Sequence, residues 1–307
     1  MTKSFVHLHA HTEYSMLDGA AKIVDYLKKV KELNQPAAAI TDHGNLYGAM
    51  EFVQKANDLG IKPIIGYEAY ITPGSRFDRP DRENNKRYHL TLLAENNIGY
   101  QNLVELVSKA YTEGYYYKPR IDYELLDQHH DGLIALSGCL GGELAQHLAP
   151  DGSVEEGNTS NERSFEKALD IAKKYQSIFG KENYFIEIHN HGIKQQLDIL
   201  DDLVEIAELI DAPLVAANDS HYVEENGAEA HDALLCVQTN RTLDDESRFR
   251  FDGSGYYVKS AEEMRKLFPE DKYPGACDNT LAIAVSYTHL RAHETEAELV
   301  CRLLLEK

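Results

Sequence analysis

An α/β fold made of repeated strand–helix units is the architecture that this sequence predicts. Short apolar segments of strand length alternate with amphipathic segments of helical periodicity along most of the chain. The 307 residues suit one large α/β barrel or two smaller domains, and neither an internal repeat nor a linker divides residues 1–284. Units of this kind favour parallel strands, arranged either as a barrel or as an open sheet.

The expected strands are short apolar runs that end at polar or turn-forming residues. Residues 62–71, for example, are followed by the turn pair Pro73-Gly74. In chain order, strands are predicted at residues 5–9, 37–40, 62–71, 89–94, 133–136, 184–188 and 214–217.

The expected helices carry apolar residues at intervals of three and four. The first has Ile23, Tyr26, Leu27 and Val30 on one face, and Gly60 stops the second. Two polar stretches, 75–86 and 150–161, are predicted to be loops, the first of them mobile. Helices are predicted at residues 23–33, 46–59, 100–110, 164–179, 193–210, 228–237 and 261–268.

Composition narrows the class of protein. With 51 acidic and 31 basic residues the net charge is −20, so contact with a polynucleotide would need metal ions in the site or basic groups from elsewhere. No apolar run reaches the roughly 20 residues of a membrane span, and no signal-peptide pattern opens the chain; we therefore expect a cytoplasmic protein with no membrane partner. The scattered cysteines indicate reduced thiols, with Cys236 and Cys277 in the core.

The most informative motif is a set of alternating histidines, His7, His9 and His11. Alternation is the period of a β-strand, so the three side chains share a face. Adjacent imidazoles would repel if charged and need partners if buried, whereas neutral imidazole is a common ligand of zinc and related ions. The motif predicts a metal site, and the alternative is a surface strand with a chance histidine run.

Further ligand-type residues stand at the ends of the later strands, where functional groups of a βα barrel gather. Imidazoles mixed with carboxylates suit zinc, manganese or iron better than calcium. Closely spaced ions clamp the oxygens of a phosphoryl group and lower the pKa of bound water, so the set predicts a phosphoester hydrolase better than a structural zinc site. These residues are Asp18, Asp42, His43, Glu68, His89, Cys139, Glu187, His189, His191, Asp219 and His221.

Several segments also match a known family. Residues 5–19 (FVHLHAHTEYSMLDG), 40–44 (ITDHG), 63–68 (PIIGYE) and 230–239 (AHDALLCVQT) resemble the PHP (polymerase and histidinol phosphatase) family, and within it the opening of bacterial DNA polymerase III alpha subunits. The resemblance covers about residues 1–284. It implies a distorted seven-stranded (β/α) barrel, of TIM-like form, with two or three divalent ions (Zn, Mn or Fe) in its mouth.

Matched position by position, the resemblance implies nine ligands in three groups, each group holding one ion. Glu68, Asp219 and His221 would also act in catalysis. The first group is His9, His11, Glu68 and Asp219, the second is Asp18, His43 and His221, and the third is His89 and Cys139 with Glu68 as the bridge.

Other residues keep two interpretations. His7 is expected to pack or to contact a ligand, without ligating a metal itself. Asp42 would either orient a ligand or cap a helix. His189 and His191 would either touch substrate at the rim or be ordinary surface histidines. The tyrosines at 115–117 would either stack on bases or, as we expect, form a packed loop.

The leading functional hypothesis is a 3′–5′ exonuclease that proofreads during DNA replication by metal-dependent, in-line attack of water on the terminal phosphodiester. The DNA 3′ end would be the substrate, and the rest of the alpha chain and replisome subunits would be partners. One alternative is a catalytically silent, metal-stabilised module that docks a polymerase or exonuclease partner. Another is a free-standing small-molecule phosphatase, which the polymerase-like residues 230–281 disfavour.

The C-terminal residues 285–307 look foreign to the rest of the chain. The run Val285-Ser-Tyr-Thr-His-Leu-Arg-Ala-His-Glu-Thr295 resembles the translation of a transposase-type sequencing adapter. We therefore take residues 1–284 as one domain, give His289, His293 and Cys301 no functional weight, and expect the native chain to continue past Ala284. The alternative is a genuine C-terminal helix.

Overall fold

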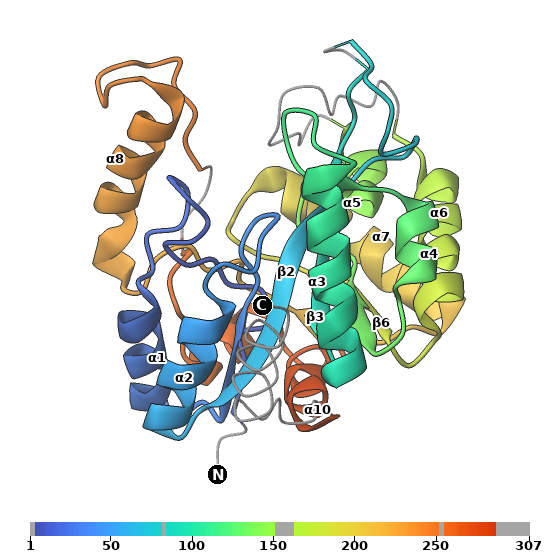
Figure 1. Ribbon diagram of the computed structural model, residues 1–307. Coiled ribbons are helices and arrows are strands. Elements are labelled where there is room, and N and C mark those ends of the chain that lie inside the picture. The colour runs from blue at the N-terminus through green and yellow to red at the C-terminus, as the bar shows by residue number, and fades with distance from the viewer. Residues whose placement is uncertain (1–3, 82–83, 151–162, 252–254, 287–307) are drawn as a thin grey trace, which may run out of the picture.

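A curled sheet surrounded by helices forms the body of the molecule (Figure 1). The structure is a computed structural model, and it describes residues 4–81, 84–150, 163–251 and 255–286. The strand order is β1-β2-β3-β5-β6-β7, with the short β4 paired to β2. The strands are β1 (Ala37–Ile40), β2 (Lys62–Ile71), β3 (Tyr88–Ala94), β4 (Arg120–Ile121), β5 (Leu133–Leu136), β6 (Tyr184–Ile188) and β7 (Leu214–Ala216).

The strand directions differ in one place from the prediction. The pairs β1–β2, β5–β6 and β6–β7 are parallel, as expected, but β3 is antiparallel to both β2 and β5. A parallel neighbour needs a long crossover, usually a helix, whereas an antiparallel neighbour does not. The described residues between β2 and β3 contain no helix, and the chain turns back directly.

The N-terminal segment closes the sheet into a distorted barrel. On one side the amides of Ala39 and Thr41 donate to the carbonyls of His7 (3.1 Å) and Ala10 (2.9 Å), and on the other the amide of His11 donates to Ser220 (2.8 Å). Residues 5–9 were predicted as a strand and are extended, but they are not a regular strand. The reason is that a side-chain hydroxyl, Thr41 Oγ1, takes the Ala10 amide at 2.8 Å, which interrupts the ladder. The predicted distorted α/β barrel is confirmed.

The helices cover the outside of this barrel. Helices α1 and α2 pack together on one side, and α5, α6 and α7 form a layer on the other (Figure 1). Asn96 and Ser164 cap α3 and α6 through their side chains. The helices are α1 (Ile23–Glu32), α2 (Ala49–Leu59), α3 (Asn97–Thr112), α4 (Tyr123–Gln128), α5 (Glu143–Leu148), α6 (Phe165–Phe179), α7 (Lys194–Ile210), η2 (Glu225–Gly227), α8 (Ala228–Thr239), α9 (Ala261–Leu267) and α10 (Asp278–Ser286).

The predicted helices are all present, with shifted ends, while β4, α4, α5, η2 and α10 were not predicted. Helix α2 begins at Ala49 instead of residue 46, because the Asn45 side chain bonds the backbone of Tyr14, His43 and Tyr47 and holds a turn there. None of the helices in the described ranges has the length and apolar character that crossing a bilayer requires.

Two predicted loops and the tail need separate mention. The stretch 75–86 has no helix or strand at its described positions, but it is anchored: buried Arg76 binds Glu113 at 2.7 Å and Asp122 at 3.0 Å. Residues 151–161 of the other loop lie outside the described residues, as do 287–307 of the suspected foreign tail. Val285 and Ser286 form the end of α10.

Candidate metal centre

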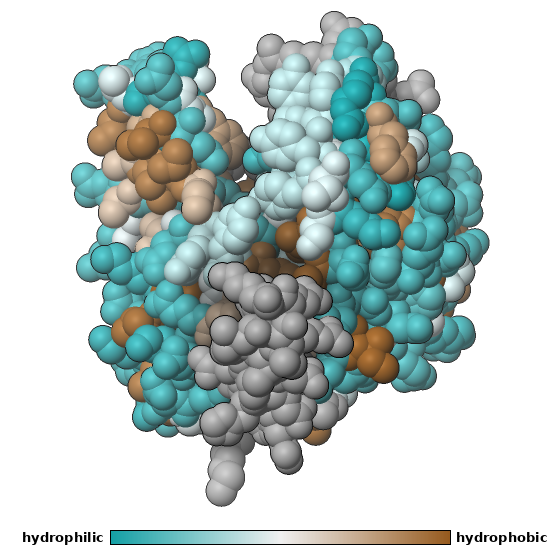
Figure 2. Space-filling view, viewed as in Figure 1, coloured by the Kyte–Doolittle hydropathy of each residue, from teal (hydrophilic) through white to brown (hydrophobic). Residues whose placement is uncertain are grey.

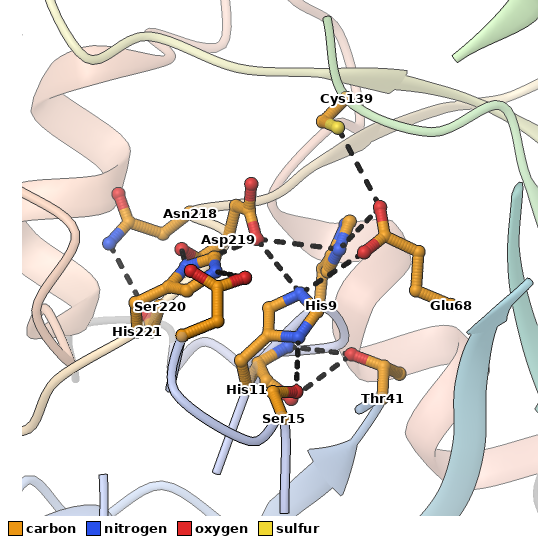
Figure 3. Close-up of polar contacts among 12 residues, drawn as sticks. His9, His11, Ser15, Thr41, Glu68, Cys139, Asn218, Asp219, Ser220 and His221 are labelled. Atoms are coloured by element: carbon orange, nitrogen blue, oxygen red, sulfur yellow. Dashed lines mark hydrogen bonds and ion pairs between the residues drawn. The ribbon is translucent and has the colours of Figure 1, made fainter. Parts of the chain in front are cut away.

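All nine residues of the predicted ligand set converge at one end of the barrel (Figure 3). They come from segments far apart in the sequence. Strand β2 supplies Glu68 and β3 supplies His89, while the loops that follow β1, β5 and β7 supply the others along with the N-terminal segment. The set is His9, His11, Asp18, His43, Glu68, His89, Cys139, Asp219 and His221.

The first predicted group has the spacing of a tetrahedral ligand shell. His9 Nε2 lies 3.4 Å from Glu68 Oε1 and 3.4 Å from Asp219 Oδ1, and His11 Nε2 lies 3.4 Å and 3.1 Å from carboxylate oxygens of the same two residues. Ligands about 2.0–2.1 Å from one ion in a tetrahedron are roughly 3.3 Å apart. The four side chains therefore fit a single ion without rearrangement.

The second predicted group lies beside the first. Asp18 Oδ2 is 2.8 Å from His43 Nε2 and 3.8 Å from His221 Nε2. The ring of His11 stacks between the other two imidazoles, with centroids 4.1 Å from His43 and 4.3 Å from His221. The two groups thus share a wall, and ions bound in them would be neighbours.

The third predicted group centres on Glu68, a fully buried carboxylate. Its Oε1 lies 2.9 Å from His89 Nδ1 and 3.6 Å from Cys139 Sγ, and its Oε2 lies 2.6 Å from His43 Nδ1. Because both oxygens also face His9 and His11, Glu68 touches every group. This is the position that a bridging carboxylate requires.

The donor atoms fit metal ions better than they fit one another. Although they are close together and inaccessible to solvent, six of them make no hydrogen bond of acceptable geometry within the described part of the chain. Buried polar atoms normally find such partners, so a set left without them points to lone pairs directed at a common ligand. The six atoms are His9 Nε2, His11 Nε2, His43 Nδ1, Glu68 Oε2, Asp219 Oδ1 and His221 Nε2.

The electrostatics of the cluster keep its carboxylates ionised. Burial alone would raise the pKa of Glu68 and Asp219, but the surrounding imidazoles hold both well below their usual range. Burial opposes charge on His9 and His43 too, yet the carboxylates lift the pKa of His9 well above normal and that of His43 to about 9. Burial lowers the pKa of His11 to about 3, so its ring stays neutral and able to ligate.

Two local features orient the ligands. Ser15 Oγ contacts His11 Nδ1 at 2.9 Å and donates to Asp42 at 2.7 Å, and Asp42 also accepts from Thr12. Of the two roles predicted for Asp42, the structure therefore favours orienting a ligand over capping a helix. Asp219 has a left-handed backbone (φ 45°), a conformation that costs a non-glycine residue on the order of 1 kcal/mol and is concentrated at functional sites.

Glu187 is a buried carboxylate of this cluster to which the sequence interpretation gave no role. It ends β6 and lies 2.7 Å from His9 Nδ1 and 2.9 Å from His189 Nε2. The signal that could have found it is an acidic residue inside a strand whose other members, from Tyr184 to Ile188, are apolar and fully buried.

Three other predicted histidines lie close by without joining the ligand set. His7 is buried and contacts the Lys259 carbonyl at 2.9 Å, which agrees with a packing role. His189 and His191 are both buried, so the surface interpretation was wrong. His191 stacks on Tyr256 with centroids 3.9 Å apart, and burial lowers its pKa to about 3.

The remaining sequence expectations divide. Cys236 and Cys277 are buried core thiols, as predicted. The tyrosines at 115–117 are not a packed loop, because Tyr115 and Tyr117 are 54% and 65% exposed. Tyr116 Oη donates to the Pro80 carbonyl at 2.8 Å and leaves its neighbours at the surface.

Comparison with known proteins places this cluster in a family. The model of the PHP domain matches residues 7–191. DNA polymerase III alpha subunits from Saccharopolyspora erythraea, Mycobacterium tuberculosis and Thermus aquaticus are 46%, 48% and 49% identical over 91–92% of this chain. The chain spans about a quarter of the length of these relatives (24%, 24% and 22%).

A distant likeness to a solved structure accompanies these matches. A two-domain protein from Bacteroides vulgatus that contains a predicted PHP-like metal-dependent phosphoesterase shares 12% identity with this chain, at a TM-score of 0.41. The match covers 71% of this chain and 52% of that one.

Proposed function

This chain belongs to the PHP domain family, and on that premise we propose that it is the metal-dependent phosphoesterase domain of a DNA polymerase III alpha subunit that removes nucleotides from DNA 3′ ends. The observation that carries the proposal is the convergence of nine nitrogen, oxygen and sulfur donors in one buried cluster. A structural zinc site needs four ligands and no open position, whereas this cluster offers more donors than one ion uses.

The residues would divide among two or three divalent ions of the zinc, manganese or iron type. His9, His11, Glu68 and Asp219 would hold one, Asp18, His43 and His221 a second, and His89 and Cys139 a third bridged by Glu68. When bound, such ions lower the pKa of water and neutralise charge on the transferring phosphoryl group.

The open side of the cluster indicates where a phosphodiester would enter. His9, His11 and Glu68 have side chains at most 1% exposed, whereas Asp18 and His43 are 15% and 17% exposed. Asp219 is also partly open, at 13%. Substrate would therefore approach over these last three, and the buried residues would form the floor.

The chain's own groups would then carry the proton chemistry. Asp219 is held ionised by the surrounding imidazoles and reaches solvent, so one of its carboxylate oxygens can accept the proton of an attacking water. His221 lies 3.5 Å from Asp219 through Nδ1, and that nitrogen also contacts the Asp219 carbonyl at 2.8 Å. This pair holds the carboxylate in place while the proton moves.

The choice of DNA as substrate rests on the relatives. They are DNA polymerase III alpha subunits, and hydrolysis at a 3′ end would serve proofreading beside polymerisation. The net charge of −20 means that cations in the site would have to offset repulsion of the DNA backbone. The rest of an alpha chain and other replisome subunits would be the partners that supply further contact.

The test combines metal content with turnover on DNA. Purified protein loaded with Mn²⁺ is incubated with 3′-mismatched and 3′-paired DNA, and with p-nitrophenyl phosphate as a small phosphomonoester. We expect nucleotide release from mismatched DNA and its loss in Asp219→Ala. The matched control, Asp201→Ala, removes a carboxylate that is 85% exposed and should leave release unchanged.

Each other outcome assigns a different function. Full metal loading without release from DNA would support a metal-stabilised structural module. Turnover of p-nitrophenyl phosphate alone would support a small-molecule phosphatase. Equal release by wild type and Asp219→Ala would identify a contaminating nuclease.

A further inference from the structure

We propose that Glu187 is a positioning residue of the metal centre, which holds His9 in the tautomer and orientation that direct Nε2 at an ion. The inference rests on the proposed metal-dependent function, because it concerns an ion that His9 would bind. Glu187 is not one of the nine predicted ligands, and it lies on the opposite side of the His9 ring from them.

The two nitrogens of His9 have different surroundings. Nδ1 lies 2.7 Å from Glu187 Oε1, and Thr91 Oγ1 approaches it at 3.2 Å. Nε2 faces Glu68 and Asp219 at 3.4 Å and makes no hydrogen bond. A carboxylate that accepts the Nδ1 proton leaves the Nε2 lone pair for a metal and makes the imidazole a stronger donor.

Glu187 is itself held rigidly, which positioning requires. Its side chain is fully buried, and its backbone amide donates to Ser137 Oγ at 2.9 Å. Oε1 is also 2.9 Å from His189 Nε2. Oε2 accepts from the Gly138 amide at 3.0 Å. With both oxygens engaged, the carboxylate has a single orientation open to it.

The contact with Gly138 connects Glu187 to a second predicted ligand. Gly138 precedes Cys139 and has φ 89°, and a Cβ at this position would meet the His89 carbonyl at 2.7 Å. The loop therefore takes a conformation that only glycine adopts easily, and Glu187 bonds its backbone there. One buried carboxylate thus ties His9 to the loop that presents Cys139.

The other ligating histidines are held by weaker or different groups. His11 Nδ1 contacts a neutral hydroxyl, Ser15 Oγ, and His221 Nδ1 contacts a backbone carbonyl. His9 alone, among the histidines of the predicted ligand set in the described structure, has a non-ligand carboxylate on its second nitrogen. Loss of this charge should therefore weaken metal binding at the His9 position specifically.

The experiment measures metal affinity directly, without DNA. Zn²⁺ and Mn²⁺ are titrated into the chelator-stripped chain, wild type and Glu187→Gln, with a competing indicator dye. Glutamine keeps the shape but places either an amide NH₂ or a neutral oxygen against groups that now meet a carboxylate. We expect the Kd of the affected ion to rise about 10- to 100-fold, with full occupancy restored at excess metal.

A matched variant separates this effect from the general cost of losing a buried carboxylate. Glu143→Gln makes the same substitution at a buried glutamate that bonds Tyr123 and Tyr175 and no predicted ligand, so its metal Kd should equal that of wild type. Equal Kd values for wild type and Glu187→Gln would overturn the inference. Absence of metal binding by wild type would instead overturn the proposed function.

A second measurement covers the case in which Glu187→Gln does not fold. In the zinc-loaded wild type, long-range ¹⁵N–¹H spectra of the imidazoles should show His9 protonated at Nδ1 and metallated at Nε2. The reverse pattern would overturn the inference. Glu187→Asp, which keeps the charge but withdraws it by one methylene, should show a Kd between those of wild type and Glu187→Gln.

Discussion

Two buried glutamates in this protein, Glu68 and Glu143, have opposite environments. Both are at least 94% inaccessible to solvent (1% and 6% exposed). Glu68 lies among imidazoles that hold its pKa well below normal, and its Oε2 has no hydrogen bond. Glu143 receives hydroxyl protons from Tyr123 and Tyr175, and burial still raises its pKa.

The comparison teaches how burial for function differs from burial for structure. Glu143 behaves as a satisfied core group, because the protein supplies the donors that the carboxyl needs. Glu68 has neighbours that are themselves acceptors or cations waiting for a better partner, so its environment is complete only with ions present. Side chains of one type, equally buried, are thus distinguished by whether the chain alone completes their coordination.

The largest expected effect breaks the comparison at Glu68. Glu68→Gln removes the carboxylate that touches all three predicted ligand groups, so nucleotide release should fall on the order of 10³-fold. Glu143→Gln should change it less than about twofold, since that residue touches no predicted ligand. Single-turnover rates on 3′-mismatched DNA at saturating Mn²⁺ measure both. Similar losses in the two variants would contradict the distinction.

Removal of metal should have the next largest effect, and it should act on stability. An ion at 100 times its Kd stabilises the fold by about 2.7 kcal/mol, so a chelator should lower the Tm by roughly 5–10 °C. Differential scanning fluorimetry with and without Mn²⁺ tests this. Glu143→Gln should keep the full metal-dependent shift and Glu68→Gln should lose most of it; identical melting with and without metal in wild type would refute the expectation.

The pH dependence of the metal-free protein should carry opposite signs for the two residues. The pKa of Glu68 is lowered by folding, so the stability it contributes is present above its unfolded pKa and is lost as pH falls through the folded value. The pKa of Glu143 is raised, so its contribution is present below the unfolded pKa and is lost as pH rises through the folded value.

Urea unfolding in chelator between pH 3.5 and 7 measures these contributions. Relative to Glu68→Gln, wild type should lose stability toward acid, and relative to Glu143→Gln it should lose stability toward neutral pH. A wild-type curve that runs parallel to either variant would show that the corresponding pKa is not shifted by folding.

The smallest expected effect sharpens the description of the Glu143 region. Lys174 Nζ lies 3.0 Å from the centroid of the Tyr123 ring, and Lys174→Met should cost about 0.5–1 kcal/mol of unfolding free energy. Lys173→Met, next in sequence and 56% exposed, is the control and should cost less. Metal affinity should not change in either, and a weaker Kd in Lys174→Met would show that the two regions are coupled.

Much of the fold followed from local patterns in the sequence. Strands such as β1, β2 and β5 and helices such as α6 and α7 lie where apolar periodicity predicted them, because such patterns depend on neighbours along the chain. Shorter elements such as α4 and α5, six residues each, were missed since two turns carry too little periodicity to stand out.

The candidate site divides in the same way. Its donors were predictable as residue types, because imidazoles and carboxylates at strand ends are costly unless they bind something. Their grouping around Glu68 came with the family resemblance. The reversed direction of β3, the burial of His189 and His191, and the contact of His9 with Glu187 across 178 positions were decided by the tertiary structure. Closure of the barrel alone brings such distant segments together, and no local pattern encodes which side chains then meet.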